Sequence, residues 1–492
     1  MTRLPAVLLF AAAPALAFAN PTAGTDLKSM TSRVTPEALR AHVSFLASDA
    51  LEGRATPSRG EEVAAEYIAA QFRRAGLKPA GDDGYFQTAN WKYAQRNAAD
   101  FTMTIEAGGK TISVPHTQVS YGYKGAYQLP ATAVVRVDAA GAMANPKQAD
   151  GKILFLQAPG AGQVQATLQK LKDAGARPAA VILVDSQRKT GSGGAEGWLV
   201  DPAAKPAAPR PPVISVHGAD AQALLEGADA RVSLAIPAGA ERPVKLRNVI
   251  GVLPGSDAAL KDTYVILSAH YDHVGINNGE IFNGANDNAS GVASMIEVAS
   301  AMAQSKQRPR RSVVFLALWG EELGMVGSNY YGRNPVFPLA KTVANLNLEQ
   351  MGRTDDMEGP QVDRAAMTGF DFSDMGAIMQ KTGAAMGIKV FKHEKFSDVF
   401  FGRSDNQALA DQGIPSHTMS VAYAFPDYHG KDDTWDKLDY DNMARVTRMV
   451  AAGLTTLANS ATAPKWNEAN KKTAPYVSAA AKLMAPPAAS AK

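Results

Sequence analysis

Residues 264–273 read YVILSAHYDH, a near-continuous apolar run that ends in two histidines and an aspartate. A run of this kind predicts a strand buried on both faces, as in a parallel sheet that helices cover. Ligands of open parallel sheets gather beyond the carboxyl ends of the strands. His270, Asp272 and His273 therefore stand at an edge where a functional site is expected.

The same order of strand, loop and helix repeats through the second half of the chain. Further strands are predicted at 249–253, 312–318, 342–348 and 416–421. Amphipathic helices are predicted there at 289–304, 322–331, 372–383, 406–412 and 440–457, and near the start of the chain at 36–50 and 60–76. Buried strands that alternate with amphipathic helices favour an α/β fold, with a mixed, mainly parallel sheet sandwiched by helices.

Between about residues 120 and 240 the pattern changes to short strand-like runs separated by Gly and Pro, which predicts a separate small α/β module inserted in the chain. The expected divisions are a signal peptide at 1–19, the first part of the main domain at 20–119, the inserted module at 120–240, the rest of the main domain at 241–462, and a loosely ordered tail rich in Ala, Pro and Lys at 463–492.

The first residues predict export. An apolar run from Leu4 to Phe18 follows Arg3 and ends in Ala17-Phe18-Ala19, a small-x-small cleavage site. We expect a periplasmic or extracellular protein without a membrane span in the mature chain, since this run is too short and no other stretch approaches the required length. The chain has no cysteine, so disulfides do not stabilise it.

The charge balance argues against a nucleic-acid partner. The formal net charge is only +3 over 492 residues, and no basic run with interleaved aromatic residues is present. Most charges of the short clusters Asp432-Asp433 and 308–311 are interpreted as solvated surface.

Further histidine and carboxylate side chains follow the other strands. Asp287 lies in a loop just before the helix at 289–304, Glu321 and Glu322 follow the strand at 312–318, Glu349 follows the strand at 342–348, and His429 lies late in the chain. With His270 the set provides two histidines, three carboxylate ligands and one spare glutamate. Asp272, two residues from His270 in extended chain, is expected to orient that histidine.

This set of residues has the chemistry of a metal centre. Imidazole with carboxylate suits zinc or a similar divalent ion. One histidine and one terminal carboxylate for each ion, with a bridging carboxylate, support two ions about 3.5 Å apart, which would activate a water and polarise a scissile carbonyl. The spare glutamate would take the proton of the water and pass it to the leaving amine. The signatures of serine hydrolases and single-zinc endopeptidases, Gly-x-Ser-x-Gly and His-Glu-x-x-His, are absent from the sequence.

The sequence resembles the co-catalytic zinc exopeptidases of metallopeptidase family 28, in the branch with a protease-associated domain. The resemblance is carried by these motifs, by the inserted module and by residues 46–54, 403–405 and 413–415. The resemblance spans nearly the whole mature chain. It implies a zinc-exopeptidase, phosphorylase/hydrolase-like fold with a protease-associated insert. It also implies roles for the site residues: His270 and Glu349 on one zinc, Glu322 and His429 on the other, Asp287 bridging and Glu321 as the general base.

Three positions depart from the family pattern. Glu349 stands where many relatives have Asp, Asn406 stands where relatives often have His, and Pro57 replaces a common Gly. The first keeps the site with added reach, the second predicts a changed contact in the substrate pocket, and the third is expected to lie far from the chemistry.

Other aromatic residues and histidines remain open. Tyr428 could donate its hydroxyl to an oxyanion, as in some relatives, or could be a buried core tyrosine. His273, His393 and His417 have no matched ligand role and are interpreted as structural or pocket-lining.

The resemblance implies an exported aminopeptidase that releases N-terminal residues from peptides with two zinc ions, although another divalent metal stays possible. A carboxypeptidase or another amide hydrolase is an alternative, because the metal ligands do not encode which peptide end is bound. A non-catalytic receptor is a second alternative, against which the complete ligand set and Glu321 argue. The sequence does not determine the oligomeric state.

Overall fold

The computed structural model describes residues 21–137, 145–157, 162–184, 193–194, 197–205, 210–227 and 229–485. The predicted signal peptide at 1–19 lies outside them. The chain divides into two compact units, unit 1 from residues 1–89 and 246–492 and unit 2 from residues 90–245. None of the described helices is both long and apolar enough to cross a membrane.

Unit 1 is built on a mixed sheet. Its strands are β1 (Lys78–Pro79), β2 (Phe86–Gln95), β13 (Ala240–Leu253), β14 (Tyr264–His270), β17 (Ser312–Leu318), β18 (Thr342–Leu348), β21 (Arg364–Met367), β22 (Lys389–Phe391) and β23 (Ser416–Ser420). The order runs β2-β13-β17-β14-β18-β23-β21-β22, and β1 pairs with β13. The neighbours β17, β14, β18 and β23 are parallel, whereas β13 and β21 join them antiparallel. The predicted mixed, mainly parallel sheet is thereby confirmed.

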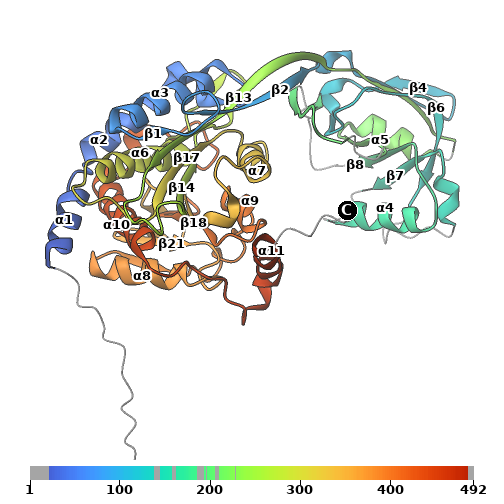
Figure 1. The fold of residues 1–492 in the computed structure, drawn as a ribbon. Helices are drawn as coiled ribbons and strands as arrows, with labels where there is room; N and C mark the ends of the chain where they lie inside the picture. Colours follow the sequence, from blue (N-terminus) through green and yellow to red (C-terminus); the bar gives the residue numbers. More distant parts are fainter. Residues whose placement is uncertain are drawn as a thin grey trace, which may run out of the picture. The chain divides into compact units, whose positions relative to one another are not determined.

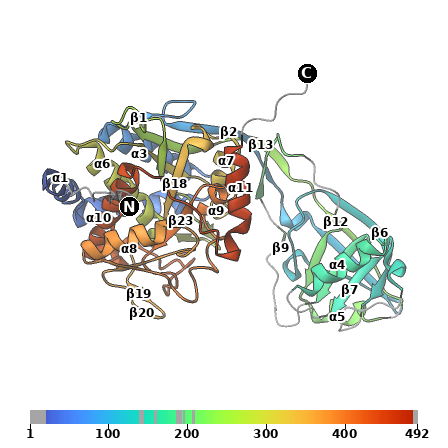
Figure 2. The same cartoon turned by 60° about the horizontal axis from the view of Figure 1, so that its bottom comes forward.

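Helices cover both faces of this sheet (Figure 1). They are α1 (Pro21–Thr31), α2 (Pro36–Leu46), α3 (Arg59–Ala75), α6 (Ser290–Ala303), α7 (Val326–Arg333), α8 (Met375–Ala385), α9 (Asn406–Ala410), α10 (Tyr440–Asn459) and α11 (Ala474–Met484). Figure 2 shows α6 and α10 on one side of the strands and α7, α9 and α11 on the other.

The alternation of side chains along β17 explains the two layers. Phe315 packs on Phe72 of α3, with ring centroids 6.2 Å apart. Its neighbour Leu316 points the other way, into a core with Tyr331 of α7 and Leu409 of α9. Because successive residues of a strand face opposite sides, an all-apolar strand needs a helix layer on each side.

The helix that precedes the sheet shows how local sequence sets its limits. Ser58 caps α3 by accepting a hydrogen bond from the backbone N–H of Glu61 at 3.1 Å. Gly76 ends the helix with φ at 79°, a left-handed conformation that glycine adopts without strain. The predicted helix at 60–76 therefore matches α3 closely.

Unit 2 has its own sheet and core. Its elements are β3 (Thr102–Ala107), β4 (Lys110–Ser113), β5 (Val119–Tyr121), β6 (Tyr127–Arg136), β7 (Ile153–Gln157), β8 (Ala180–Val184), β9 (Gly193–Gly194), β10 (Gly197–Val200), β11 (Val213–Val216), β12 (Arg231–Ile236), α4 (Gln163–Asp173) and α5 (Ala219–Leu225). The sheet order is β4-β3-β12-β6-β7-β8-β11-β5-β9, and β10 pairs with the end of β2.

Unit 2 begins at residue 90, earlier than the predicted start at 120. The reason is that β3 pairs antiparallel with β12 and also with β4, so residues 102–113 complete the sheet of the insert and do not belong to the main domain. Local sequence could not show this pairing, because the partner strand lies more than a hundred residues later. The identity of this unit as a protease-associated domain stays a prediction.

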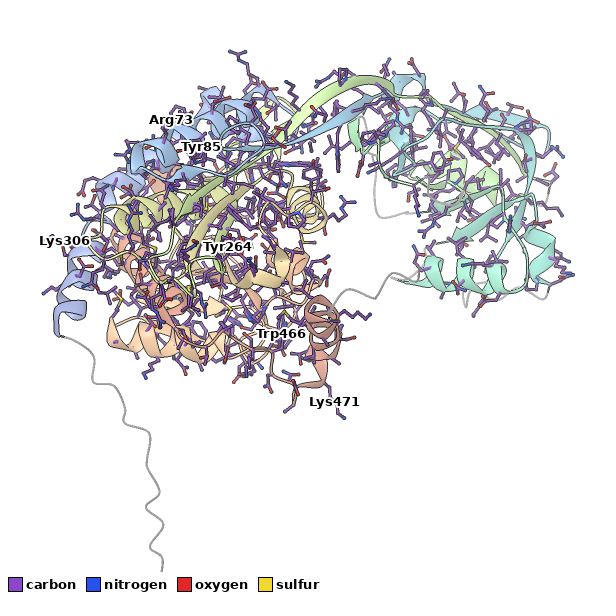
Figure 3. All side chains as sticks on the ribbon, in the orientation of Figure 1. Arg73, Tyr85, Tyr264, Lys306, Trp466 and Lys471 are labelled. Atoms are coloured by element: carbon purple, nitrogen blue, oxygen red, sulfur yellow. The ribbon has the colours of Figure 1, made fainter. Side chains whose placement is uncertain are left out.

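The end of the chain corrects another expectation. The segment after 462 was predicted to be loosely ordered, yet α11 packs on unit 1, and Trp466 is buried beside it (Figure 3). The Trp466 ring stacks on Tyr476 with centroids 5.0 Å apart, and its Nε1 donates to the Gly413 carbonyl at 2.8 Å. An Ala-rich composition can form a packed helix once a few aromatic residues anchor it.

Candidate metal centre

The predicted ligands lie just beyond the ends of the central strands. His270 is the last residue of β14, and Glu349 directly follows β18. Glu321 and Glu322 follow β17 in a turn that includes Gly320 at φ 66°. The predicted helix at 322–331 therefore begins only at 326 in α7, which leaves both glutamates in the turn.

Asp287 stands between two groups of ligand atoms. It lies in η5 (Ala285–Ala289), the turn that leads into α6. Its Oδ1 is 3.4 Å from His270 Nε2, and its Oδ2 is 3.2 Å from His429 Nε2. Glu349 Oε1 completes the first group at 3.6 Å from His270 Nε2, and Glu322 Oε2 completes the second at 3.2 Å from His429 Nε2. The fold thus brings together all the predicted ligands, with Asp287 shared.

His273 joins the second group. One ligand atom from each of His273, Asp287, Glu322 and His429 lies within 4.8 Å of the others. The Nδ1 of His273 is 2.9 Å from Glu322 Oε1. Sequence reasoning had treated this histidine as structural or pocket-lining, although its place in the same strand-end run as His270 was a usable signal.

The converging atoms fit a pair of divalent ions. Among the described residues, the buried atoms His270 Nε2, Asp287 Oδ1 and His273 Nε2 have no hydrogen-bond partner, although nearly all buried polar atoms have one. Close contacts with Asp287 and Glu322 raise the pKa of His429 to about 10, which reports an excess of negative charge. Imidazole and carboxylate donors are those that zinc prefers.

Asp272 holds the glutamate turn. Its Oδ1 accepts from the backbone N–H of Glu321 at 3.0 Å, and its Oδ2 accepts from that of Glu322 at 3.3 Å. The same carboxylate is 3.7 Å from His270 Nδ1, beyond hydrogen-bond distance, whereas the Asp272 carbonyl lies 3.3 Å from that nitrogen. The role of this carboxylate in orienting His270 stays a prediction.

Glu321 is kept apart from the ligands. Neither group of candidate ligand atoms among the described residues includes it. Burial raises the pKa of its carboxyl well above the usual range, although the charge of His270 acts in the opposite direction. A carboxyl with a raised pKa beside a metal centre suits proton transfer near neutral pH.

Two buried charged residues, missed by sequence reasoning, hold the loops of the site. Asp433, with 0% exposure, accepts hydrogen bonds from the backbone N–H groups of Asn286 and Asp287, so it is not part of the solvated surface expected for most of its cluster. The Arg54 guanidinium donates to four carbonyls, those of Leu46, Tyr271, Asn283 and Gly284. Burial lowers the pKa of Arg54 to about 10. Contacts between residues so far apart in the sequence cannot be recognised from a local sequence pattern.

The remaining open residues take different places. Tyr428 is 51% exposed and stacks on the ring of His429 with centroids 4.0 Å apart, so the alternative of a core tyrosine is wrong. His393 stacks on Phe396 at 4.6 Å and belongs to neither ligand group. His417 is buried between Ser373 Oγ at 2.6 Å and the Thr368 carbonyl at 2.9 Å, which is a structural role.

The structure shows the surroundings of two positions that depart from the family pattern, Asn406 and Pro57. Asn406 has 0% exposure, and its side chain bonds to the Phe401 carbonyl and Thr418 Oγ1, so it offers no contact to a substrate pocket. Thr56, the residue before Pro57, packs near Gly320, the residue before Glu321: its Cγ2 lies 3.7 Å from the position that a Cβ on Gly320 would occupy. The turn that contains Pro57 therefore lies against the turn that carries Glu321, and the expectation that it is far from the chemistry is wrong.

Comparison with known sequences agrees with this centre. Residues 248–454 match the model of peptidase family M28. Aminopeptidase YwaD of Bacillus subtilis is 24% identical over 261 residues, which cover 52% of this chain and 53% of the relative. A probable glutamate carboxypeptidase, VP8 of Zea mays, is 29% identical over 212 residues, which cover 40% of this chain and 27% of the relative. The chain thus spans about a quarter to a half of the length of these curated relatives.

Solved structures share the fold. An aminopeptidase from Aneurinibacillus sp. strain AM-1 superimposes with a TM-score of 0.62 at 19% identity, covering 90% of this chain and 97% of that one. A zinc aminopeptidase from Bacillus subtilis gives a TM-score of 0.55 at 18% identity, covering 87% and 96%.

The sheet, its helix layers and the histidine–carboxylate groups at the strand ends form an α/β fold with a candidate metal centre. The match over 248–454 contains all the predicted metal ligands and Glu321. Over these residues the chain is similar to peptidase family M28.

Proposed function

We propose that this protein is a zinc-dependent aminopeptidase that removes N-terminal residues from peptides. The observation that carries the proposal is the position of Asp287, whose two carboxylate oxygens face His270 and His429 separately. A carboxylate shared in this way suits a centre with two ions. The similarity to solved structures named as aminopeptidases supports the same reading.

Each side chain has a defined task. His270 with Glu349, and His429 with Glu322, would hold the two ions on either side of Asp287. Two zinc ions bound there would polarise a peptide carbonyl and lower the pKa of a water. Glu321 would take a proton from the attacking water and pass it to the leaving amine, for which its raised pKa is suited.

The charges around the site favour an amino terminus. Two cations lie beside the segment that leads to His429, and both are paired: Arg353 Nη1 and Lys437 Nζ lie 2.8 and 3.0 Å from Asp427 Oδ2. Neither is free to hold the carboxylate of a peptide C-terminus. These ion pairs favour the amino terminus of a peptide over its C-terminus as the bound end.

A panel of free-amino and N-acetylated peptides, offered to the purified protein and to Glu321→Ala, tests the proposal. We expect cleavage of the free-amino peptides alone, a loss of cleavage in the variant, and about two metals per chain in both proteins. Release of residues from the C-terminus of acetylated peptides would establish a carboxypeptidase, the activity in the name of the Zea mays relative. Absence of turnover together with absence of bound metal would favour a receptor.

We also propose that the chain is exported and that unit 2 is a protease-associated domain. The apolar run that ends at Ala17-Phe18-Ala19 supports export, and the mass of the mature protein recovered from cells would show whether residues 1–19 are removed. The separate α/β core of unit 2 supports a protease-associated domain.

Peptides of increasing length test a role of this domain in substrate selection. Since β2 and β13 are neighbours, a short turn can replace residues 90–245. We expect the shortened protein to lose discrimination by peptide length, and unchanged discrimination would contradict that role.

A further inference from the structure

His273 is held rigidly beside the second group of ligand atoms. Its side chain is buried, and 1% of the residue is exposed. Its backbone N–H donates to the Arg54 carbonyl at 3.3 Å. A Cβ added at Gly284 would lie 2.4 Å from Cγ of the ring, so the backbone of that glycine packs directly on the imidazole. The ring of His429 meets it edge-on, with centroids 5.5 Å apart.

The two oxygens of Glu322 have different neighbours. Oε1 is 2.9 Å from His273 Nδ1, and Oε2 is 3.2 Å from His429 Nε2. A carboxylate has four lone-pair sites and can turn to bind an ion through one oxygen or through both. An N–H that holds Oε1 removes this freedom and leaves Oε2 facing the side of Asp287 and His429.

We propose that His273 is a positioning residue for the second metal: its Nδ1–H donates to Glu322 Oε1 and makes Glu322 a ligand through Oε2 alone. The proposal assigns a role to His273, which the sequence alone does not connect with the metal centre. It rests on the proposed two-metal centre. Hydrogen-bond partners of metal-binding carboxylates tune metal affinity, and their loss weakens it by about 10- to 100-fold.

Direct ligation by His273 is the competing possibility, because its Nε2 is buried without a hydrogen-bond partner. Asparagine separates the two roles. Its Nδ2 stands at the same distance along the side chain as Nδ1 of histidine and can donate to Glu322, but asparagine has no atom at the position of Nε2.

The experiment measures zinc binding to chelator-treated, full-length protein by competition with a chromophoric chelator. We compare wild type, His273→Ala, His273→Asn and the control His393→Ala, whose ring lies outside both ligand groups. We expect one of the two ions to bind about 10- to 100-fold more weakly to His273→Ala. His273→Asn should recover most of this affinity, and the control should bind as wild type does.

Visible spectra of the cobalt-substituted proteins provide a second readout, since their intensity depends on the number of ligands. Equal loss of affinity in His273→Ala and His273→Asn, with a cobalt spectrum changed in both, would overturn the positioning role in favour of direct ligation. Unchanged binding of both ions by His273→Ala would overturn it in favour of a packing role. A wild-type protein that binds fewer than two ions would instead refute the proposed function, so the two failures are distinguishable.

Discussion

Asp433→Asn should loosen the turn that carries the shared ligand Asp287. In the wild type, Oδ1 of Asp433 accepts from the N–H of Asn286 at 2.9 Å, and Oδ2 accepts from the N–H of Asn286 at 3.1 Å and of Asp287 at 3.0 Å. Asparagine keeps one acceptor oxygen and replaces the other with an amide that cannot accept. At least one of these three hydrogen bonds is therefore lost, and in either orientation the amide N–H group faces the backbone N–H of Asn286, donor against donor.

The size of the effect follows from these contacts. A hydrogen bond to a charged group contributes about 1.5 to 3 kcal/mol, and an unsatisfied buried donor costs a similar amount. We expect the free energy of unfolding of the metal-free protein to fall by about 2 to 3 kcal/mol in Asp433→Asn. Zinc affinity should fall by about 10- to 100-fold, because Asp287 is no longer held in place.

Urea unfolding measures the first quantity, and amide hydrogen exchange of residues 284–290 locates it. Asp432 is the matched control, because it is the exposed neighbour of buried Asp433. Asp432→Asn should change stability by no more than about 0.5 kcal/mol. If both variants unfolded at the same urea concentration and exchanged the Asn286 and Asp287 amides at the same rate, the reasoning would be refuted.

Three further predictions concern separate parts of unit 1. Glu321→Gln should lower kcat by about 100- to 10,000-fold with metal content and unfolding midpoint unchanged, since only proton transfer is removed; a smaller loss would exclude Glu321 as the base. Burial lowers the pKa of His417 to about 4. Below about pH 6.5 the unfolded chain therefore binds a proton on this histidine that the folded chain does not bind. The free energy of unfolding should fall by about 3 kcal/mol from pH 7 to pH 4 for this reason. Urea unfolding of His417→Gln should lack that part of the pH dependence, and an identical pH profile would contradict it. Trp466→Ala should destabilise the protein by about 3 to 5 kcal/mol and make α11 sensitive to limited proteolysis, and protection equal to wild type would show that the ring does not anchor this helix.

The sequence by itself determined the layered fold and the edge where the site lies. The run 264–269 is apolar on both faces apart from Ser268, which predicts a strand buried on both sides, as in a parallel sheet covered by helices. His270 and Glu349 stand within one residue of strand ends, and the carboxyl ends of parallel strands meet at one edge. The candidate ligands that directly follow strands could therefore be predicted from local pattern.

Only the tertiary structure decided which neighbours hold those ligands. Asp272 and His273 both follow His270, yet the carboxylate of Asp272 bonds to the glutamate turn and the ring of His273 to Glu322. Buried Asp433 and exposed Asp432 are adjacent residues of the same type. The limits of unit 2 and the packing of α11 also depend on partners distant in sequence. Strand and helix periodicity is a local property, whereas these contacts depend on the paths of loops, which many weak interactions across the whole fold determine together.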